Sequence, residues 1–149
     1  MTLANPEQLS TLMDIYTTLG YDTAKLDEES KGREWIELGF QCEDPASDFR
    51  GTGRLGLLNL HYFAKSDTPK AVKLLNEANL TEQHYFFACG GINFTHKLLF
   101  MLAEEKVKIH TFENCNDKED ALHRFNLLYS KFFEDFHQYW MNSNLKTSI

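Results

Sequence analysis

The chain has 149 residues, 42% of them hydrophobic and 25% charged, which fits one globular domain with a core large enough to fold alone. Lysine and arginine number 15 against 22 aspartates and glutamates, a formal net charge of −7. Neutralising phosphates requires clustered basic residues, which the sequence lacks, so a general nucleic-acid or anionic-membrane binder is disfavoured. We expect a single domain over residues 1–149.

The cysteines and the N-terminus bear on the cellular compartment. Cys42, Cys89 and Cys115 are widely spaced and form no CxxC pattern, which is typical of reduced thiols in a cytosolic protein. The N-terminal residues MTLANPEQL lack a basic region followed by an apolar run, as a secretory signal would require. Both observations predict a cytoplasmic protein.

The first predicted helix begins at Asn5-Pro6-Glu7, with Asn5 as N-cap and Pro6 in the first helical position. Apolar residues follow at helical spacing up to Gly20: Leu9, Leu12, Met13, Tyr16 and Leu19. A second, short helix is predicted over residues 33–38, with Trp35 and Leu38 on one face. The polar residues between these helices predict a loop.

The later helices differ in how much of their surface is apolar. Residues 55–64 are apolar around most of a helix, which predicts a buried central helix. Thr68-Pro69 starts a short outer helix, with Thr68 as N-cap and Pro69 as its first residue. Asp117 starts a last, long helix rich in aromatic residues.

A further element begins at Thr81-Glu82, and the run over residues 85–103 is apolar nearly all round. Polar residues in the middle of that run, such as Asn93 and Lys97, favour a buried core helix over a membrane span. Gly90-Gly91 predicts a kink, a close helix crossing or a break within it.

The pattern as a whole predicts an all-α fold. No segment alternates with period two, no hairpin dipeptide separates two apolar runs, and no internal repeat is visible. Because the predicted helices differ greatly in length and apolar coverage, we expect an irregular bundle of six or seven helices with a buried central helix.

The most constrained part of the chain is residues 35–60, WIELGFQCEDPASDFRGTGRLGLLNL, which we call the signature segment. Gly39, Gly51 and Gly53 predict positive φ or close backbone approach. Pro45 fixes its own φ and restricts Asp44, so the segment should be a shaped connection.

The signature segment resembles that of the ELMO domain, the engulfment and cell-motility family. That signature reads Trp, two residues, Ile-Gly-Phe-Gln, three residues, Pro, two residues, Phe-Arg-Gly, then Gly and spaced leucines. Leu38, Cys42 and Ser47 depart mildly from the usual residues. The positions in register are Trp35, Gly39, Phe40, Gln41, Pro45, Asp48, Phe49, Arg50, Gly51, Gly53, Leu57 and Leu60.

The resemblance implies a function in small-GTPase signalling. Members similar to this chain act as GTPase-activating proteins for Arf and Arf-like GTPases, and their activity depends on the arginine that corresponds to Arg50. An arginine supplied in trans stabilises charge on the β and γ phosphates. The alternatives are a non-catalytic adaptor in a Rac pathway, like the larger engulfment proteins, or an effector that binds GTPase without changing hydrolysis. Partner binding would recruit this cytoplasmic protein to membranes.

The residues themselves leave the role of Arg50 open. Arg50 is either the catalytic finger or a structural clamp, because Glu43, Asp44 and Asp48 lie close by in sequence and a bidentate arginine–carboxylate pair could hold the turn. Asp44 is most simply the N-cap of a helix at Pro45, with Asp48 as a local ion-pair partner.

The two remaining polar candidates are Gln41 and Arg54. Gln41 could orient the attacking water, or its side chain could cap the neighbouring loop. Arg54 could contact phosphate or the GTPase, or be an ordinary exposed arginine. With Asp44 and Asp48, these residues make up the candidate GTPase-binding set, whereas Trp35, Gly39, Phe40, Pro45, Phe49, Gly51 and Gly53 are expected to shape the turn.

No metal or cofactor of the chain's own is expected. The six histidines form no HExxH motif and no Cys/His cluster with metal spacing. No GxxxxGK[ST] loop occurs either, so any Mg²⁺ in the reaction would belong to the nucleotide of the partner.

Overall fold

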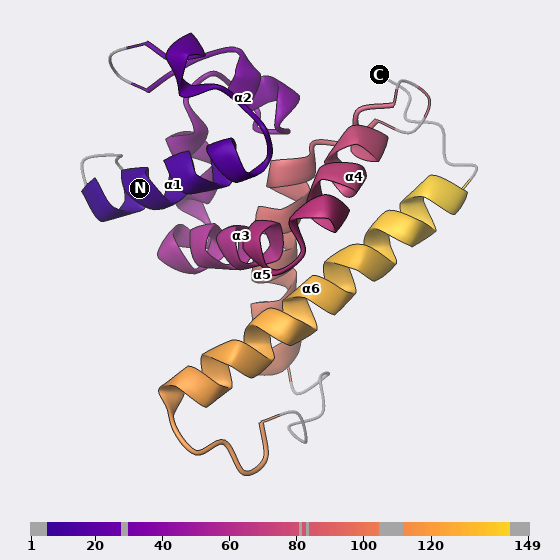
Figure 1. The fold of residues 1–149 in the computed structure, drawn as a ribbon. Helices are drawn as coiled ribbons and strands as arrows, with labels where there is room; N and C mark the ends of the chain where they lie inside the picture. Colours follow the sequence, from indigo (N-terminus) through magenta and orange to yellow (C-terminus); the bar gives the residue numbers. More distant parts are fainter. Residues whose placement is uncertain (1–5, 28–29, 81, 83, 105–111, 144–149) are drawn as a thin grey trace.

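The computed structural model describes residues 6–27, 30–80, 82, 84–104 and 112–143, and these residues form helices and no strand. The all-α prediction is therefore confirmed, with helices of very unequal length (Figure 1). Six are α-helices and two are short 3₁₀ helices: α1 Pro6–Thr18, η1 Thr23–Lys25, α2 Glu34–Glu37, η2 Pro45–Arg50, α3 Gly53–Ser66, α4 Thr68–Ala78, α5 Phe87–Ala103 and α6 Lys118–Asn142.

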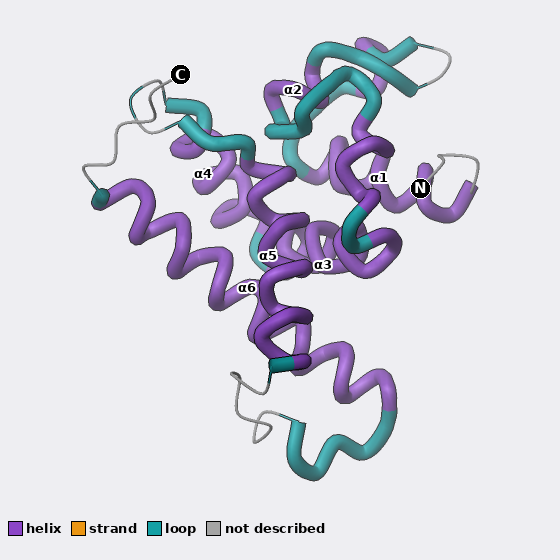
Figure 2. The backbone as a smooth tube through the Cα atoms, turned by 180° about the vertical axis from the view of Figure 1, so that it is seen from behind, coloured by secondary structure: helices purple, strands orange, loops and turns teal. Residues whose placement is uncertain are grey.

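Helix α3 lies at the centre of the bundle, as predicted. It packs against α1, α4, α5, α6 and η2, and Figure 2 shows α1, α4, α5 and α6 around it. Leu57, Leu60 and Phe63 are fully or almost fully buried along it. Burying leucine and phenylalanine side chains contributes about 1.5–3 kcal/mol each, so α3 is the helix on which the core is built.

The crossing of α5 over α3 and α6 depends on a glycine. An added Cβ at Gly91 would lie 2.7 Å from the hydroxyl of Tyr129 on α6 and 3.1 Å from Leu60 on α3. Helix α5 runs unbroken through Gly90 and Gly91. Of the three predictions for this pair, close helix crossing is the one that the structure bears out.

Aromatic rings fill the space beside that crossing. The ring of Phe133 on α6 lies 5.0 Å from Phe63, 5.2 Å from Phe87 and 5.7 Å from Phe94, measured between centroids. Rings at such separations interact favourably beyond their burial. The Phe133 ring thus joins α6 to α3 and α5, whereas Leu122 and Tyr139 of the predicted apolar face are 40% and 67% exposed.

Two buried polar side chains, Asn59 and His137, make hydrogen bonds to other parts of the bundle. Asn59 of α3 donates to the hydroxyl of Thr95 on α5 at 2.9 Å. His137 of α6 is buried, with Nδ1 2.9 Å from the hydroxyl of Tyr85 and Nε2 2.8 Å from a carboxylate oxygen of Glu77. Burial raises the pKa of Tyr85, so this hydroxyl keeps its proton and serves packing rather than acid–base chemistry.

Helix α1 is attached to α3 partly through charge. Oδ2 of Asp14 lies 2.7 Å from Nε2 of His61, and Lys65 donates to Oδ1 of Asp14 at 3.0 Å. The hydrogen bond with His61, and to a smaller extent that with Lys65, lowers the pKa of Asp14 from its ordinary value. The carboxylate therefore stays ionised at neutral pH and holds two turns of α3 against α1.

One predicted N-cap and one predicted helix start are wrong. Asp67, not Thr68, caps α4 by accepting a hydrogen bond from the amide of Lys70, while Thr68 donates to a carbonyl of α3. Helix α5 begins at Phe87 instead of Thr81-Glu82. The other starts, at Pro45 and after Asp117, are confirmed, and the predicted cap Asn5 lies outside the described residues.

Helix α5 is also less buried than its composition predicts. Its first part, from Phe87 to Leu98, supplies the buried residues, whereas Leu99 and Phe100 are exposed. Among the described residues, no helix is both long enough and apolar enough to cross a membrane.

Candidate functional site

The signature segment begins with a turn pressed against the start of α5. Gly39 has φ +93°, and an added Cβ would lie 2.2 Å from the amide nitrogen of Phe87. The amides of Ala88 and Cys89 donate to the carbonyls of Leu38 and Gly39 at 3.3 and 3.0 Å. Since the first amides of a helix lack partners within it, the turn satisfies the N-terminus of α5, and only glycine permits that approach.

A row of buried aromatic rings supports the same segment from inside. Trp35 is fully buried and donates from its indole nitrogen to the carbonyl of Ser30 at 2.9 Å. Ring centroids are separated by 4.6 Å from Tyr16 to Trp35, 5.5 Å from Trp35 to Phe40 and 5.9 Å from Phe40 to Phe49. The expected structural roles of Trp35, Phe40 and Phe49 are therefore packing roles that tie the segment to α1.

The helix η2 is capped as the Asp-Pro pair predicts. Asp44 accepts a hydrogen bond from the amide of Ala46 at 3.0 Å, and Pro45 is buried at the first helical position. The carbonyl of Asp44 also accepts from the amide and hydroxyl of Ser47. Asp44 thus shapes η2, and its carboxylate is engaged within the chain.

Asp48 joins three parts of the molecule instead of pairing with Arg50. Its Oδ2 accepts a hydrogen bond from the amide of Gln41 at 2.9 Å and from the thiol of Cys89 at 3.4 Å. Burial, together with the charge of Asp48, raises the pKa of Cys89 to about 12, so this thiol remains a proton donor. The predicted ion pair of Asp48 is replaced by a link from the Gln41 loop to α5.

Arg50 ends η2 with an exposed side chain. Its Nε donates to the carbonyl of Ser47 at 2.7 Å. In the described part of the chain, no carboxylate lies within ion-pair distance of Arg50, so the clamp with Glu43, Asp44 or Asp48 is not formed. The guanidinium is held at one nitrogen and faces solvent.

The other two polar candidates are in different situations. Gln41 is exposed, and the cap on this loop is the carboxylate of Asp48 on its backbone amide, not the Gln41 side chain. Arg54, in the first turn of α3, forms an exposed ion pair with Glu7 of α1. Gln41 therefore offers a side-chain amide at the surface, on the loop that Asp48 ties to η2, whereas Arg54 already has a partner.

The last two glycines of the signature segment are unlike each other. Gly53, the first residue of α3, has φ +54°, so the prediction of a positive φ is confirmed at this position. Gly51 has an ordinary φ of −85°, and an added Cβ would meet nothing within 4 Å. The prediction of positive φ or close approach is therefore wrong for Gly51, which is exposed beside Arg50.

Sequence reasoning missed residues that contact this site from outside the segment. Cys89 reaches Asp48 from α5, and the backbone of Phe86 lies against Gly39. The sequence indicated only that Phe86 and Cys89 lie near the start of an apolar helix. That position does not reveal which other part of the chain the start of the helix contacts.

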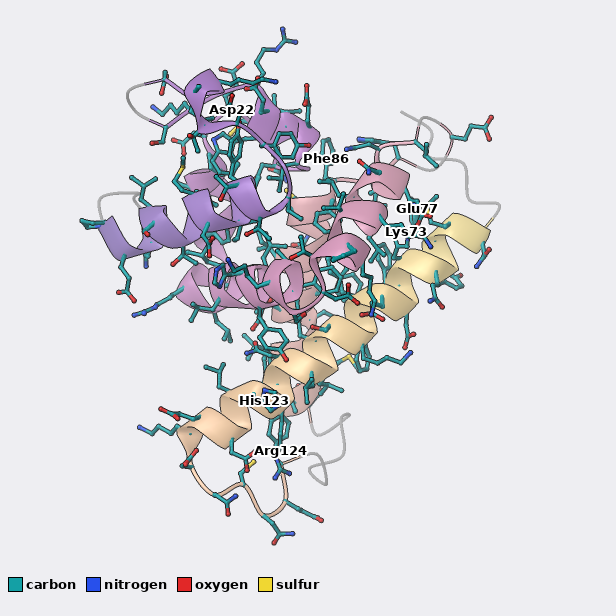
Figure 3. The ribbon with its side chains drawn as sticks, viewed as in Figure 1. Asp22, Lys73, Glu77, Phe86, His123 and Arg124 are labelled. Carbon is teal, nitrogen blue, oxygen red and sulfur yellow. The ribbon has the colours of Figure 1, made fainter. Side chains whose placement is uncertain are left out.

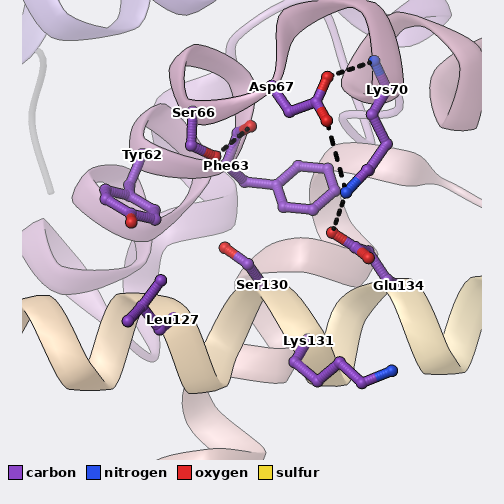
Figure 4. A pocket seen from close by; sticks show the side chains of 9 residues that line it. All are labelled: Tyr62, Phe63, Ser66, Asp67, Lys70, Leu127, Ser130, Lys131 and Glu134. Atoms are coloured by element: carbon purple, nitrogen blue, oxygen red, sulfur yellow. Dashed lines mark hydrogen bonds and ion pairs between the residues drawn. The ribbon is translucent and has the colours of Figure 1, made fainter.

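A separate cavity of about 330 Å³ lies between α6 and the junction of α3 with α4 (Figure 4). The cavity is lined by Tyr62, Phe63, Ser66, Asp67, Lys70, Leu127, Ser130, Lys131 and Glu134. Lys70 donates to Glu134 at 3.0 Å and lies 3.4 Å from Asp67, so the charge of Lys70 is paired with two carboxylates that also line the cavity. None of the lining residues was a sequence candidate, and none belongs to the signature segment.

Metal ligands are not gathered anywhere in the described ranges. No group of three or more His, Cys, Asp or Glu side chains there could hold a metal ion. The chemistry that the site offers is that of the exposed guanidinium of Arg50 and the exposed side-chain amide of Gln41, on segments linked through Asp48.

The fold and the site together define an all-α domain that presents one arginine from a glycine-shaped turn. The model of the ELMO/CED-12 family matches residues 1–148. The chain belongs to the ELMO/CED-12 family.

Individual relatives agree with that assignment. ELMO domain-containing protein 2 of Mus musculus is 32% identical over 138 residues, which cover 93% of this chain and 46% of the relative. ELMO domain-containing protein B of Dictyostelium discoideum is 39% identical over 115 residues, covering 77% and 39%. ELMO domain-containing protein 1 of Homo sapiens is 29% identical over 165 residues, covering 94% and 48%. The chain spans about half the length of the relatives it matches or less, and no solved structure matches it.

Proposed function

We propose that this protein stimulates GTP hydrolysis by a small GTPase of the Arf or Arf-like family. The observation that carries the proposal is the state of Arg50, whose exposed guanidinium has no carboxylate partner in the described chain. Arg50 ends the helix η2, which Asp44 caps and which the buried ring of Phe49 supports from inside. A positive group held in this way is suited to meet negative charge on another molecule.

The mechanism would be stabilisation of charge in the transition state. When the γ-phosphoryl group is transferred to water, negative charge spreads over the phosphate oxygens, and an arginine provided in trans accelerates the reaction by roughly 10³–10⁵-fold. Arg50 would supply that charge. Gln41, exposed on the loop that Asp48 ties to η2, would contact the GTPase or the attacking water.

The nucleotide and its Mg²⁺ would both belong to the GTPase, so the chain would activate its partner without an active site of its own. Such a partner would also determine location: a cytoplasmic protein would be brought to whichever membrane its GTPase occupies.

A non-catalytic adaptor or effector is the second candidate, including one in a Rac pathway. The hydrogen bond from Arg50 to the carbonyl of Ser47 favours it, because this bond would give Arg50 a structural use. In that case the protein would bind the GTP-loaded form and leave the hydrolysis rate unchanged.

The decisive experiment is single-turnover GTP hydrolysis by a panel of Arf, Arf-like and Rac GTPases, with Arg50→Lys beside the wild type. Lysine keeps the charge and loses the planar fork of donors. The matched control is Arg33→Lys, which changes another exposed arginine, at the N-cap of α2.

We expect stimulation to fall at least about 10²-fold in Arg50→Lys while binding to the GTP-loaded GTPase and the urea midpoint are kept. Arg33→Lys should retain stimulation. If the wild type binds GTP-loaded GTPase but stimulates no member of the panel, the activating function is refuted and the adaptor or effector function stands.

A further inference from the structure

Three apolar side chains are exposed where the end of α2 meets the connection between α4 and α5. Ile36, Leu80 and Phe86 are 38%, 53% and 45% exposed, and we call them the apolar patch. The amide side chain of Asn79 donates to the carbonyl of Glu37 at 2.9 Å. Because Asn79 precedes Leu80 and Glu37 follows Ile36, this bond brings the two segments together. Figure 3 shows Phe86 beside α2 and the C-terminal end of α4.

Phe86 occupies a position that favours other residues. It is the N-cap of α5, with φ −72° and ψ 99°, and it makes no side-chain capping bond. Asp44, Asp67 and Asp117 cap η2, α4 and α6 with their side chains. The amides that a side-chain cap would bind in α5, those of Ala88 and Cys89, donate instead to the carbonyls of Leu38 and Gly39. The Phe86 side chain therefore has no capping role; its ring meets that of His84 edge-on at 5.2 Å and stays 45% exposed.

The apolar patch is continuous with the signature segment. The carbonyl carbon of Phe86 would lie 2.9 Å from a Cβ on Gly39, and Gly39 donates to the carbonyl of Ile36 at 3.0 Å. Two residues beyond Gly39, the amide of Gln41 is bonded to Asp48 of η2. The patch is thus linked through Gly39 to the turn that holds Gln41, and through Asp48 to η2, which Arg50 ends.

The charges around the patch select a protein over a lipid surface. Residues 34–39 and 79–86 contain Glu34, Glu37 and Glu82 and neither lysine nor arginine, while exposed Arg33 precedes the first range and Lys25 lies 4.0 Å from Glu34. This mixture lacks the cluster of basic residues by which proteins bind anionic headgroups. Exposed aromatic and aliphatic side chains rimmed by polar residues are typical of protein interfaces.

We infer that the apolar patch docks the same GTP-loaded GTPase that Arg50 contacts, by receiving an apolar part of its surface. The inference rests on the proposed function and assigns binding and acceleration to different residues. The patch supplies affinity, with Phe86 at its centre, while Arg50 supplies acceleration. Loss of the patch should therefore change the protein concentration needed for stimulation, and not the rate at saturation.

The test is Phe86→Ser in the full chain. Serine removes the ring and leaves the backbone bonds from Ala88 and Cys89 to Leu38 and Gly39 in place, so α5 should form as in the wild type, and the urea midpoint of the variant checks this. The readouts are the half-maximal concentration for stimulated hydrolysis and the Kd for the GTPase loaded with a non-hydrolysable GTP analogue. Leu127→Ser is the control, because Leu127 is 51% exposed on α6, away from the patch.

We expect Phe86→Ser to raise both values about 10-fold or more, as truncation of an interface aromatic does, with the saturated rate retained. Unchanged values, or an equal effect of Leu127→Ser, would overturn the inference while leaving the proposed function intact. So would a wild-type dimer that Phe86→Ser dissociates without changing GTPase affinity, since a second copy would then be the occupant. If the wild type neither binds nor stimulates any GTPase, both proposals fail together.

Discussion

Replacing Gly39 with alanine should test how the signature segment is attached to α5. Two penalties add at this residue. A left-handed φ such as +93° costs an L-residue about 1–2 kcal/mol. The new Cβ would also lie 2.2 Å from the amide nitrogen of Phe87 and 2.7 Å from that of Ala88, and backbone atoms cannot rotate aside as a flexible side chain can.

Overpacking of this kind costs about 1–3 kcal/mol. The free energy of unfolding should therefore fall by about 2–5 kcal/mol, a large share of the 5–15 kcal/mol typical of a domain. Urea denaturation followed by far-ultraviolet circular dichroism would measure it.

Two other glycines separate the contributions. Gly20 has φ +94° with nothing within 4 Å of an added Cβ, so Gly20→Ala should lose only the conformational part, about 1–2 kcal/mol. Gly51 has neither feature, and Gly51→Ala should be neutral or gain up to about 1 kcal/mol. A loss at Gly39 no larger than at Gly20 would refute the close approach to α5.

Two further predictions concern ionisable groups. At pH 8, a thiol reagent should label exposed Cys42 quickly and leave Cys89 unlabelled until the protein unfolds, because burial and Asp48 raise the pKa of Cys89 to about 12. Loss of the fast phase in Cys42→Ser would verify the assignment, and rapid labelling of Cys89 in the native protein would contradict it. Acid should destabilise the protein partly through Asp14, whose pKa is lowered from 3.8 by hydrogen bonds from His61 and then Lys65. As the pH falls toward and below 3.8, the unfolded chain binds the proton first and stability drops. Asp14→Asn should therefore show a shallower loss of stability between about pH 5 and pH 3 in urea titrations, and an unchanged slope would exclude this contribution.

Features that depend on a few adjacent residues could be predicted from the sequence. Asp44-Pro45 starts η2 because the carboxylate reaches the amide two residues on and proline has its φ preset. Asp117 caps α6 for the same local reason. The central position of α3 was also predictable, since a helix that is apolar around most of its surface can be stable only when surrounded.

Features that depend on distant contacts could not be predicted. Asp48 was expected to pair with Arg50 two positions away, but its partners are the amide of Gln41 and a thiol at Cys89. Nothing in a local pattern indicates that the start of α5 folds back onto Gly39. Burial of α5 was overestimated because composition does not tell which end of a helix extends beyond its neighbours, as Leu99 and Phe100 do.

The hydrogen bond from Nε of Arg50 to the carbonyl of Ser47 has an entropic consequence. A free arginine side chain samples many rotamers, and immobilising such a side chain at an interface costs about 0.5–1.5 kcal/mol. Here one nitrogen is already fixed to the turn, which restricts the torsions nearest the backbone and leaves chiefly the orientation of the guanidinium plane to be set. The side chain is thus partly preorganised before any partner arrives, and less of the interaction energy is spent on ordering it.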